Sequence, residues 1–170
     1  MHHEKRFLGK SDLQVTPVAF GTWPIAGVTS LDVNDQESLD TIRACADLGI
    51  HFIDTAYCYG PNGESENLLR TALAESREKF VIATKCGIHY GTDGKQTQDA
   101  RPEQIRRECD ASLQRLGTDR VELYYLHAPD PQVPVAESAG AIGELIDQGK
   151  VLYAGASNCQ LDQIQEFHAA

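Results

Sequence analysis

The sequence predicts an α/β fold of the (β/α)8-barrel type, of which the chain holds about five βα units after an N-terminal β-hairpin. Short apolar runs alternate with stretches of helical periodicity, and this alternation is typical of a parallel sheet. The apolar runs recur about every 30 residues, which suits successive βα units. Three of the runs end in an ionisable residue, as expected where strand ends gather on one face of a barrel.

The elements follow one another in a regular order. The opening FLGKSDLQVTPV predicts a hairpin that turns at Lys10 to Asp12 and forms a lid or plug ahead of the main sheet. β-forming apolar residues then predict five strands: VAFGTW (18–23), HFIDTA (51–56), FVIATK (80–85), VELYYLH (121–127) and VLYAGAS (151–157). Apolar residues at helical spacing predict helices at 35–49, 64–76, 102–117, 136–149 and from 161 onward.

Glycine and proline support the predicted helix ends. Gly49 follows the first helix, Pro102 opens the third and Gly117 closes it, which are the positions these residues favour. The longest irregular piece is GIHYGTDGKQTQDAR (87–101). Because it exceeds what a structural connection requires, we interpret it as a loop that carries function.

Composition narrows the function classes. The formal net charge of -10 leaves no basic surface for a phosphate backbone, so binding to DNA or RNA is not expected. The five cysteines form no C-x-x-C pair, which argues against a disulfide framework or a zinc ribbon. No apolar run approaches the roughly 20 residues of a membrane span. These observations predict a soluble, cytoplasmic protein with reduced thiols.

Polar side chains end four of the five predicted strands. Asp54, Lys85 and His127 end the second, third and fourth strands, and Ser157 and Asn158 follow the fifth. Side chains alternate between the two faces of a strand, and this alternation allows the three ionisable groups to point into the mouth of the barrel. An ionisable residue at the end of each of three consecutive strands favours an active site over solvated strand ends.

Other interpretations of these residues stay open on sequence grounds. His127 also suits a hydrogen-bonded core histidine, and Tyr57 or Tyr59 could simply pack. Ser157 and Asn158 suit a helix cap after the fifth strand equally well. A metal site would draw on side chains near the ends of strands two to four, namely His51, Cys58, Cys86, His89 and His127. Their spacing matches no compact ligand motif, so no metal is expected.

An aspartate, a lysine and a tyrosine together make a unit for proton transfer. A tyrosine is a weak acid, with an unperturbed pKa of about 10. A neighbouring ammonium favours the phenolate, and a carboxylate keeps the ammonium charged and oriented. With a histidine that hydrogen-bonds a substrate oxygen, such a site suits carbonyl chemistry, and if hydride is the nucleophile, a nicotinamide is required.

Four ordered motifs resemble the aldo-keto reductase family: FIDTAYCYG, ATKCG, ASLQRLGTDRVELYYLHAPD and GKVLYAGASN. The resemblance begins at LGKSDLQVTPVAFGTW and covers essentially the whole chain. It implies a (β/α)8 TIM barrel that binds NADPH and reduces small aldehydes or ketones by direct hydride transfer, without a metal.

The resemblance also implies a role for individual residues. The family's catalytic aspartate, tyrosine, lysine and histidine fall on Asp54, Tyr59, Lys85 and His127, with Tyr59 rather than Tyr57 as the proton donor. The implied cofactor-binding positions are Gly21, Thr22, Trp23, Asp54, Ser157 and Asn158. Of these, Ser157 and Asn158 correspond to the pair that holds the nicotinamide carboxamide.

The chain departs from the family in length. Members generally continue for three more βα units, so we interpret residues 1–170 as the N-terminal part of a single barrel domain. An open sheet leaves strands one and five as unpaired edges. We therefore expect an isolated half-barrel to be unstable or to self-associate, unless the chain is a piece of a longer reading frame. We favour the last interpretation. The alternatives to a reductase are a cofactor-binding or regulatory module, as in potassium-channel β subunits, and an inactive fragment.

Overall fold

The computed structural model describes residues 4–30 and 32–170 and centres on one parallel sheet with strand order β3-β4-β5-β8-β9. Each strand lies beside the next one predicted along the chain, as in the wall of a barrel, so the predicted fold class is confirmed as an incomplete barrel. The strands are β3 (Phe20–Gly21), β4 (Phe52–Asp54), β5 (Val81–Cys86), β8 (Val121–Leu126) and β9 (Val151–Ala156).

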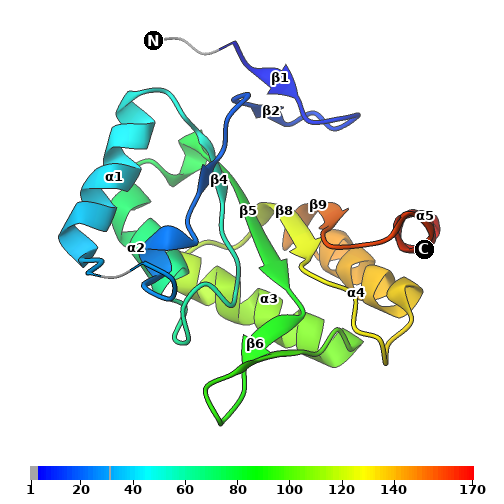
Figure 1. Ribbon diagram of the computed structural model, residues 1–170. Coiled ribbons are helices and arrows are strands. Elements are labelled where there is room, and N and C mark those ends of the chain that lie inside the picture. The colour runs from blue at the N-terminus through cyan, green and yellow to red at the C-terminus, as the bar shows by residue number, and fades with distance from the viewer. Residues whose placement is uncertain (1–3, 31) are drawn as a thin grey trace.

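Helices follow the strands in the predicted order and pack side by side along the sheet (Figure 1). They are α1 (Asp35–Asp47), α2 (Glu64–Leu73), α3 (Pro102–Leu116), α4 (Val135–Asp147) and α5 (Leu161–Ala169), with short 3-10 turns at Pro24–Ala26 and Arg77–Lys79. Pro102 opens α3 as predicted, and Gly117 ends it with a φ of 66°, a left-handed conformation that favours glycine.

Strand register separates an apolar outer face from an inner face that carries the polar residues. Ile53 and Ile82 pair across β4 and β5, and both are buried in the core that the helices cover. Asp54 pairs with Ala83 in the same register, and Lys85 pairs with Tyr125 on β8. Cross-strand partners share one face of a sheet, so the ionisable strand ends lie together on the inner face.

Two hairpins lie at opposite ends of the sheet (Figure 1). The predicted N-terminal hairpin is confirmed as β1 (Arg6–Phe7) and β2 (Gln14–Val15), and its turn is tied to the sheet where Tyr153 Oη donates to Asp12 Oδ1 at 2.8 Å. It therefore sits at the end where the strands begin, away from the ionisable strand ends.

The stretch 87–101, which we expected to be irregular, contains a second hairpin. Its strands are β6 (Ile88–Tyr90) and β7 (Gln96–Gln98). The turn closes where Gly91 N donates to Lys95 O at 2.8 Å, and Gly94 adopts a φ of 74°. A glycine at that point supplies the left-handed conformation that a tight hairpin turn demands, which is why the polar sequence forms strands.

The sheet has two open edges. Within residues 4–30 and 32–170, β3 and β9 each have one neighbouring strand. Two large apolar side chains, Leu152 on β9 and Leu161 at the start of α5, are exposed near the second edge. In the same part of the chain, no helix combines the length and apolar character needed to cross a membrane.

We expect the 170-residue chain to self-associate through β9. Ser157 N donates to Leu126 O at 2.9 Å, so alternation points the N–H of Ala154 away from β8 and toward the open edge. Ala154→Pro removes that outward donor without touching the β8 ladder. Sedimentation velocity should show concentration-dependent association that weakens in Ala154→Pro at unchanged circular dichroism. A wild-type monomer at every concentration would contradict this expectation.

Candidate active site

The Lys85 ammonium is the centre of the candidate site. Its Nζ donates to Asp54 Oδ1 at 2.6 Å, to the Thr55 carbonyl at 2.7 Å and to Tyr59 Oη at 3.1 Å. The residue is only 7% exposed. An ammonium has three protons to donate, so these three oxygens satisfy it fully. Asp54, Lys85 and Tyr59, which the sequence motifs indicate as site residues, are therefore joined by direct hydrogen bonds.

The chain after β4 explains why Tyr59 rather than Tyr57 reaches the lysine. Thr55 N donates to Ala83 O at 2.8 Å and Tyr57 N to Lys85 O at 3.1 Å, so the backbone continues alongside β5 beyond the end of β4. A turn then closes where Tyr59 N donates to Ala56 O at 3.0 Å. This turn brings the Tyr59 ring back over the lysine, with Nζ 4.6 Å from the ring centroid.

Tyr57 packs on the outer side instead. The Arg115 guanidinium carbon lies 4.3 Å from the centroid of the Tyr57 ring, and Arg115 Nη1 donates to the Tyr57 carbonyl at 3.1 Å. Arg115 also contacts the fully buried Glu66 carboxylate at 3.4 Å. The packing interpretation of Tyr57 agrees with these contacts, and Arg115 on α3 fixes the loop that presents Tyr59.

Aromatic rings surround Tyr59. The Trp23 and Tyr59 rings meet edge to face with centroids 5.0 Å apart, and the His127 ring lies 5.8 Å away on an inclined plane. The structure thus brings Trp23 and His127 to the same phenol. These contacts hold the phenol between an apolar indole and a polar imidazole.

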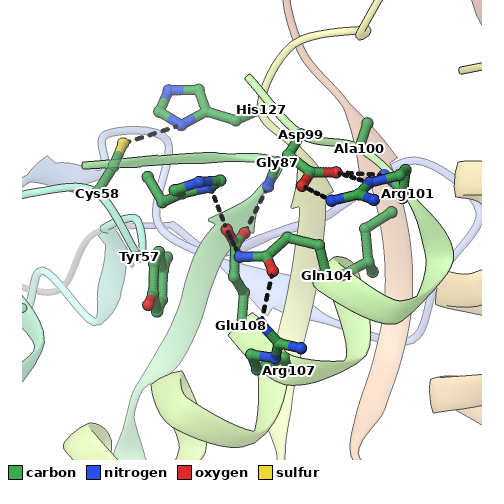
Figure 2. A network of polar contacts seen from close by, with 12 residues as sticks. Tyr57, Cys58, Gly87, Asp99, Ala100, Arg101, Gln104, Arg107, Glu108 and His127 are labelled. Carbon is green, nitrogen blue, oxygen red and sulfur yellow. Dashed lines mark hydrogen bonds and ion pairs between the residues drawn. The ribbon is translucent and has the colours of Figure 1, made fainter. Parts of the chain in front are cut away.

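His127 is held as a neutral imidazole. Burial, and secondarily the positive charge of Lys85, lower the pKa of His127 from its ordinary value of 6.5 to about 4. Its Nδ1 lies 3.5 Å from the Cys58 thiol sulfur. A dashed line marks this contact in Figure 2. This contact is not predicted from the sequence, because nothing in the chain order reveals that Cys58 faces His127.

Ser157 and Asn158 stand beside His127 at the end of β9. Asn158 Nδ2 donates to the His127 carbonyl at 2.9 Å and lies 3.2 Å from Ser157 Oγ. The helix-cap alternative is wrong, because α5 begins at Leu161 and the residue before it, Gln160, is the N-cap. Asn158 has a φ of 56°, a left-handed conformation that asparagine tolerates better than most residues.

Gly21 and Thr22, at the end of the first strand, face different sides of the sheet. Gly21 pairs with Asp54 on the inner face, and a side chain at Gly21 would meet no atom within 4 Å. The Thr22 hydroxyl turns the other way: it donates to the Asp54 carbonyl at 3.0 Å and accepts from Ser65 Oγ at 2.6 Å. The structure therefore brings Gly21 to the open side of the site but not the Thr22 side chain.

A buried carboxyl that sequence patterns do not reveal, that of Glu108, lies below Cys58 and His127 in the view of Figure 2. Glu108 on α3 accepts from Gly87 N at 2.6 Å and Gln104 Nε2 at 3.0 Å, and its other contact is His89 Nδ1 at 3.1 Å. The carboxyl thereby ties the base of the β6–β7 hairpin to α3. Burial raises the pKa of Glu108 to about 7.

Among the five side chains that a metal site would draw on, the structure shows one mutual contact, between Cys58 and His127. His51 Nδ1 lies 3.0 Å from the Gly49 carbonyl, and His89 contacts Glu108. In the part of the chain that the structure describes, no three His, Cys, Asp or Glu side chains converge as metal ligands do.

A family model described as the Aldo/keto reductase family matches residues 17–170. The chain belongs to this family. Aldo-keto reductase YhdN of Bacillus subtilis is 35% identical over 164 residues, covering 95% of this chain and 49% of the relative. An NADH-specific methylglyoxal reductase of Escherichia coli is 36% identical, with coverages of 94% and 53%. A glycerol dehydrogenase structure from Gluconobacter oxydans superposes with a TM-score of 0.88 at 36% identity, covering 97% of this chain and 51% of that one.

The chain therefore spans about half the length of the aldo-keto reductases it matches. The match includes the strands β4, β5, β8 and β9, whose ends carry the cluster around Lys85 and His127.

We expect His127 to stay neutral well below neutral pH. Because burial is the larger cause of its low pKa and Lys85 the smaller, Lys85→Met should raise the His127 pKa while leaving it below 6.5. Nuclear magnetic resonance titration of the imidazole proton gives both values, with His127→Gln to assign the signal. A wild-type pKa near 6.5, or a lower value in Lys85→Met, would contradict this account.

Glu108 should make stability fall as pH rises. A carboxyl whose folded pKa is raised binds its proton more tightly in the folded chain, so its contribution is lost between about pH 4.5 and 7 as it ionises. We expect the unfolding free energy of wild type relative to Glu108→Gln to drop by on the order of 2 kcal/mol across this range. Urea titrations of both proteins at pH 5 and about pH 8 measure the difference; a constant difference would exclude this role for Glu108.

Proposed function

We propose that this chain carries the catalytic residues of a nicotinamide-dependent oxidoreductase that reduces a small aldehyde or ketone, with Tyr59 as proton donor. The observation that carries the proposal is the buried Lys85 ammonium, 3.1 Å from Tyr59 Oη and 2.6 Å from Asp54 Oδ1. Membership of the aldo/keto reductase family supports it. We also propose a cytoplasmic location, because all five cysteines are free thiols.

Each residue has a distinct part in the proposed reaction. Tyr59 gives its phenolic proton to the carbonyl oxygen, and the Lys85 ammonium stabilises the phenolate that remains. Asp54 holds the ammonium charged and in place, since a buried cation without a partner is costly. The neutral His127 imidazole donates a hydrogen bond to the same carbonyl oxygen and orients it toward Tyr59.

The residues present fit the nicotinamide end of the proposed cofactor, which supplies a hydride when bound. A carboxamide needs both acceptors and donors, and the Asn158 amide and Ser157 hydroxyl lie 3.2 Å apart at the end of β9. Beside Asp54, Gly21 leaves space that a side chain would fill. We propose NADPH as the cofactor, and because one relative is NADH-specific, both cofactors belong in the test.

The test combines binding with turnover. Fluorescence titration of the purified chain with NADPH and with NADH measures binding, and the loss of reduced nicotinamide absorbance with a small test aldehyde measures reduction. Binding with aldehyde-dependent oxidation supports the proposal. Binding without oxidation favours the cofactor-binding module, and no binding of either cofactor overturns the reductase proposal for this chain.

Tyr59→Phe should lower kcat by about 10²- to 10⁴-fold, the usual contribution of a positioned general acid. Cofactor affinity should stay nearly unchanged, because the phenol ring and its contacts with Trp23 remain. Tyr57→Phe is the matched control: it keeps the ring on Arg115 and should retain wild-type activity. Wild-type turnover in Tyr59→Phe would exclude this tyrosine as the proton donor.

A further inference from the structure

Resting on the proposed carbonyl reduction, we propose that Cys58 is a positioning residue for His127. The buried thiol donates a hydrogen bond to Nδ1 of His127 and so holds the neutral imidazole in the tautomer that carries its proton on Nε2. The Cys58 sulfur lies 3.5 Å from Nδ1, and Figure 2 shows the two side chains facing one another. The neutral tautomer of a histidine is set by the partner of its other nitrogen.

The backbone holds the thiol firmly in place. Cys58 lies inside the turn that Tyr59 N closes on Ala56 O, and the residue is only 2% exposed. Gln96 Nε2, from the β6–β7 hairpin, approaches the Cys58 carbonyl at 3.5 Å. The same turn thus places Tyr59 against Lys85 and Cys58 against His127, so the two catalytic side chains are positioned together.

The direction of the proton follows from the two groups. A neutral imidazole has one donor and one acceptor, whereas a thiol sulfur is only a weak acceptor. Burial raises the pKa of Cys58 to about 12, so the thiol keeps its proton. A hydrogen bond from S–H to a bare Nδ1 is therefore more favourable than one from Nδ1–H to the sulfur. Because Nδ1 then carries no proton, the ring proton lies on Nε2.

Other groups around His127 leave this assignment intact. Lys85 and Tyr59 face the ring, and Asn158 Nδ2 bonds only the His127 backbone carbonyl. Among the described residues, Nδ1 has Cys58 as its hydrogen-bonding partner. The Nε2 proton then remains available for a carbonyl oxygen, whereas the opposite tautomer would turn a lone pair toward that oxygen.

The tautomer of His127 can be read directly by nitrogen-15 nuclear magnetic resonance, without turnover. We expect the Nε2–H form in wild type, its retention in Cys58→Ser, and a detectable Nδ1–H fraction in Cys58→Ala. Cys58→Val also removes the donor but fills the space, so it serves as a second variant if the alanine variant misfolds. It should show the same Nδ1–H fraction as Cys58→Ala. His127→Gln assigns the signal, and circular dichroism checks the folding of each variant.

Turnover gives a second readout. Cys58→Ala and Cys58→Val should lower kcat about fivefold, the effect expected of one ordinary hydrogen bond. Cofactor affinity should not change, and Cys58→Ser should recover most of the loss. An Nδ1–H tautomer in wild type, or the same tautomer populations in all variants, would overturn the proposal. A tautomer shift in a chain that reduces no aldehyde would support the role of Cys58 and count against the proposed reductase.

Discussion

The Lys85 ammonium is the constraint on which the arrangement of the site depends. Taking a charged group out of water costs several kcal/mol unless its charge and protons are matched. Here the ammonium donates hydrogen bonds to a carboxylate from β4, a carbonyl one residue later and a phenol from the following turn. The chain from Asp54 to Tyr59 must therefore wrap around one cation. A loop that would otherwise be free to vary in conformation becomes fixed at three points.

A second polar cluster holds the same loop from outside the sheet. Glu66 on α2 accepts from Thr84 Oγ1 at 2.8 Å and contacts Arg115, while Arg115 donates to the Tyr57 carbonyl. Glu66 is fully buried, so its partners cannot easily be exchanged for water. The loop is thus clamped between Lys85 inside and Arg115 outside. Such double support gives the phenol of Tyr59 the fixed position that the proposed proton transfer requires.

The strand order and the ionisable strand ends are predictable from the sequence because both depend on local patterns. Apolar runs mark the strands, and alternation predicts which side chains share a face, so the sequence alone suggests Lys85 as the partner of Asp54. The β6–β7 hairpin is not predicted although Asp93 and Gly94 carry its turn signal, since QTQ is polar and resembles a loop. The Cys58–His127 and Glu108–Gly87 contacts join residues distant in sequence, and no spacing rule reveals them.

The site is unevenly supported across the sheet. Asp54, Lys85 and His127 belong to β4, β5 and the end of β8, and each of these strands has a neighbour on both sides. Ser157 and Asn158 follow β9, which has one neighbouring strand in the part of the chain that the structure describes, and Asn158 is exposed. Local stability follows packing and paired backbone, so the end of β9 opens more readily than the centre of the sheet. The residues of the proposed proton transfer are thus pre-organised by this chain, whereas the proposed carboxamide contacts depend on whatever orders β9.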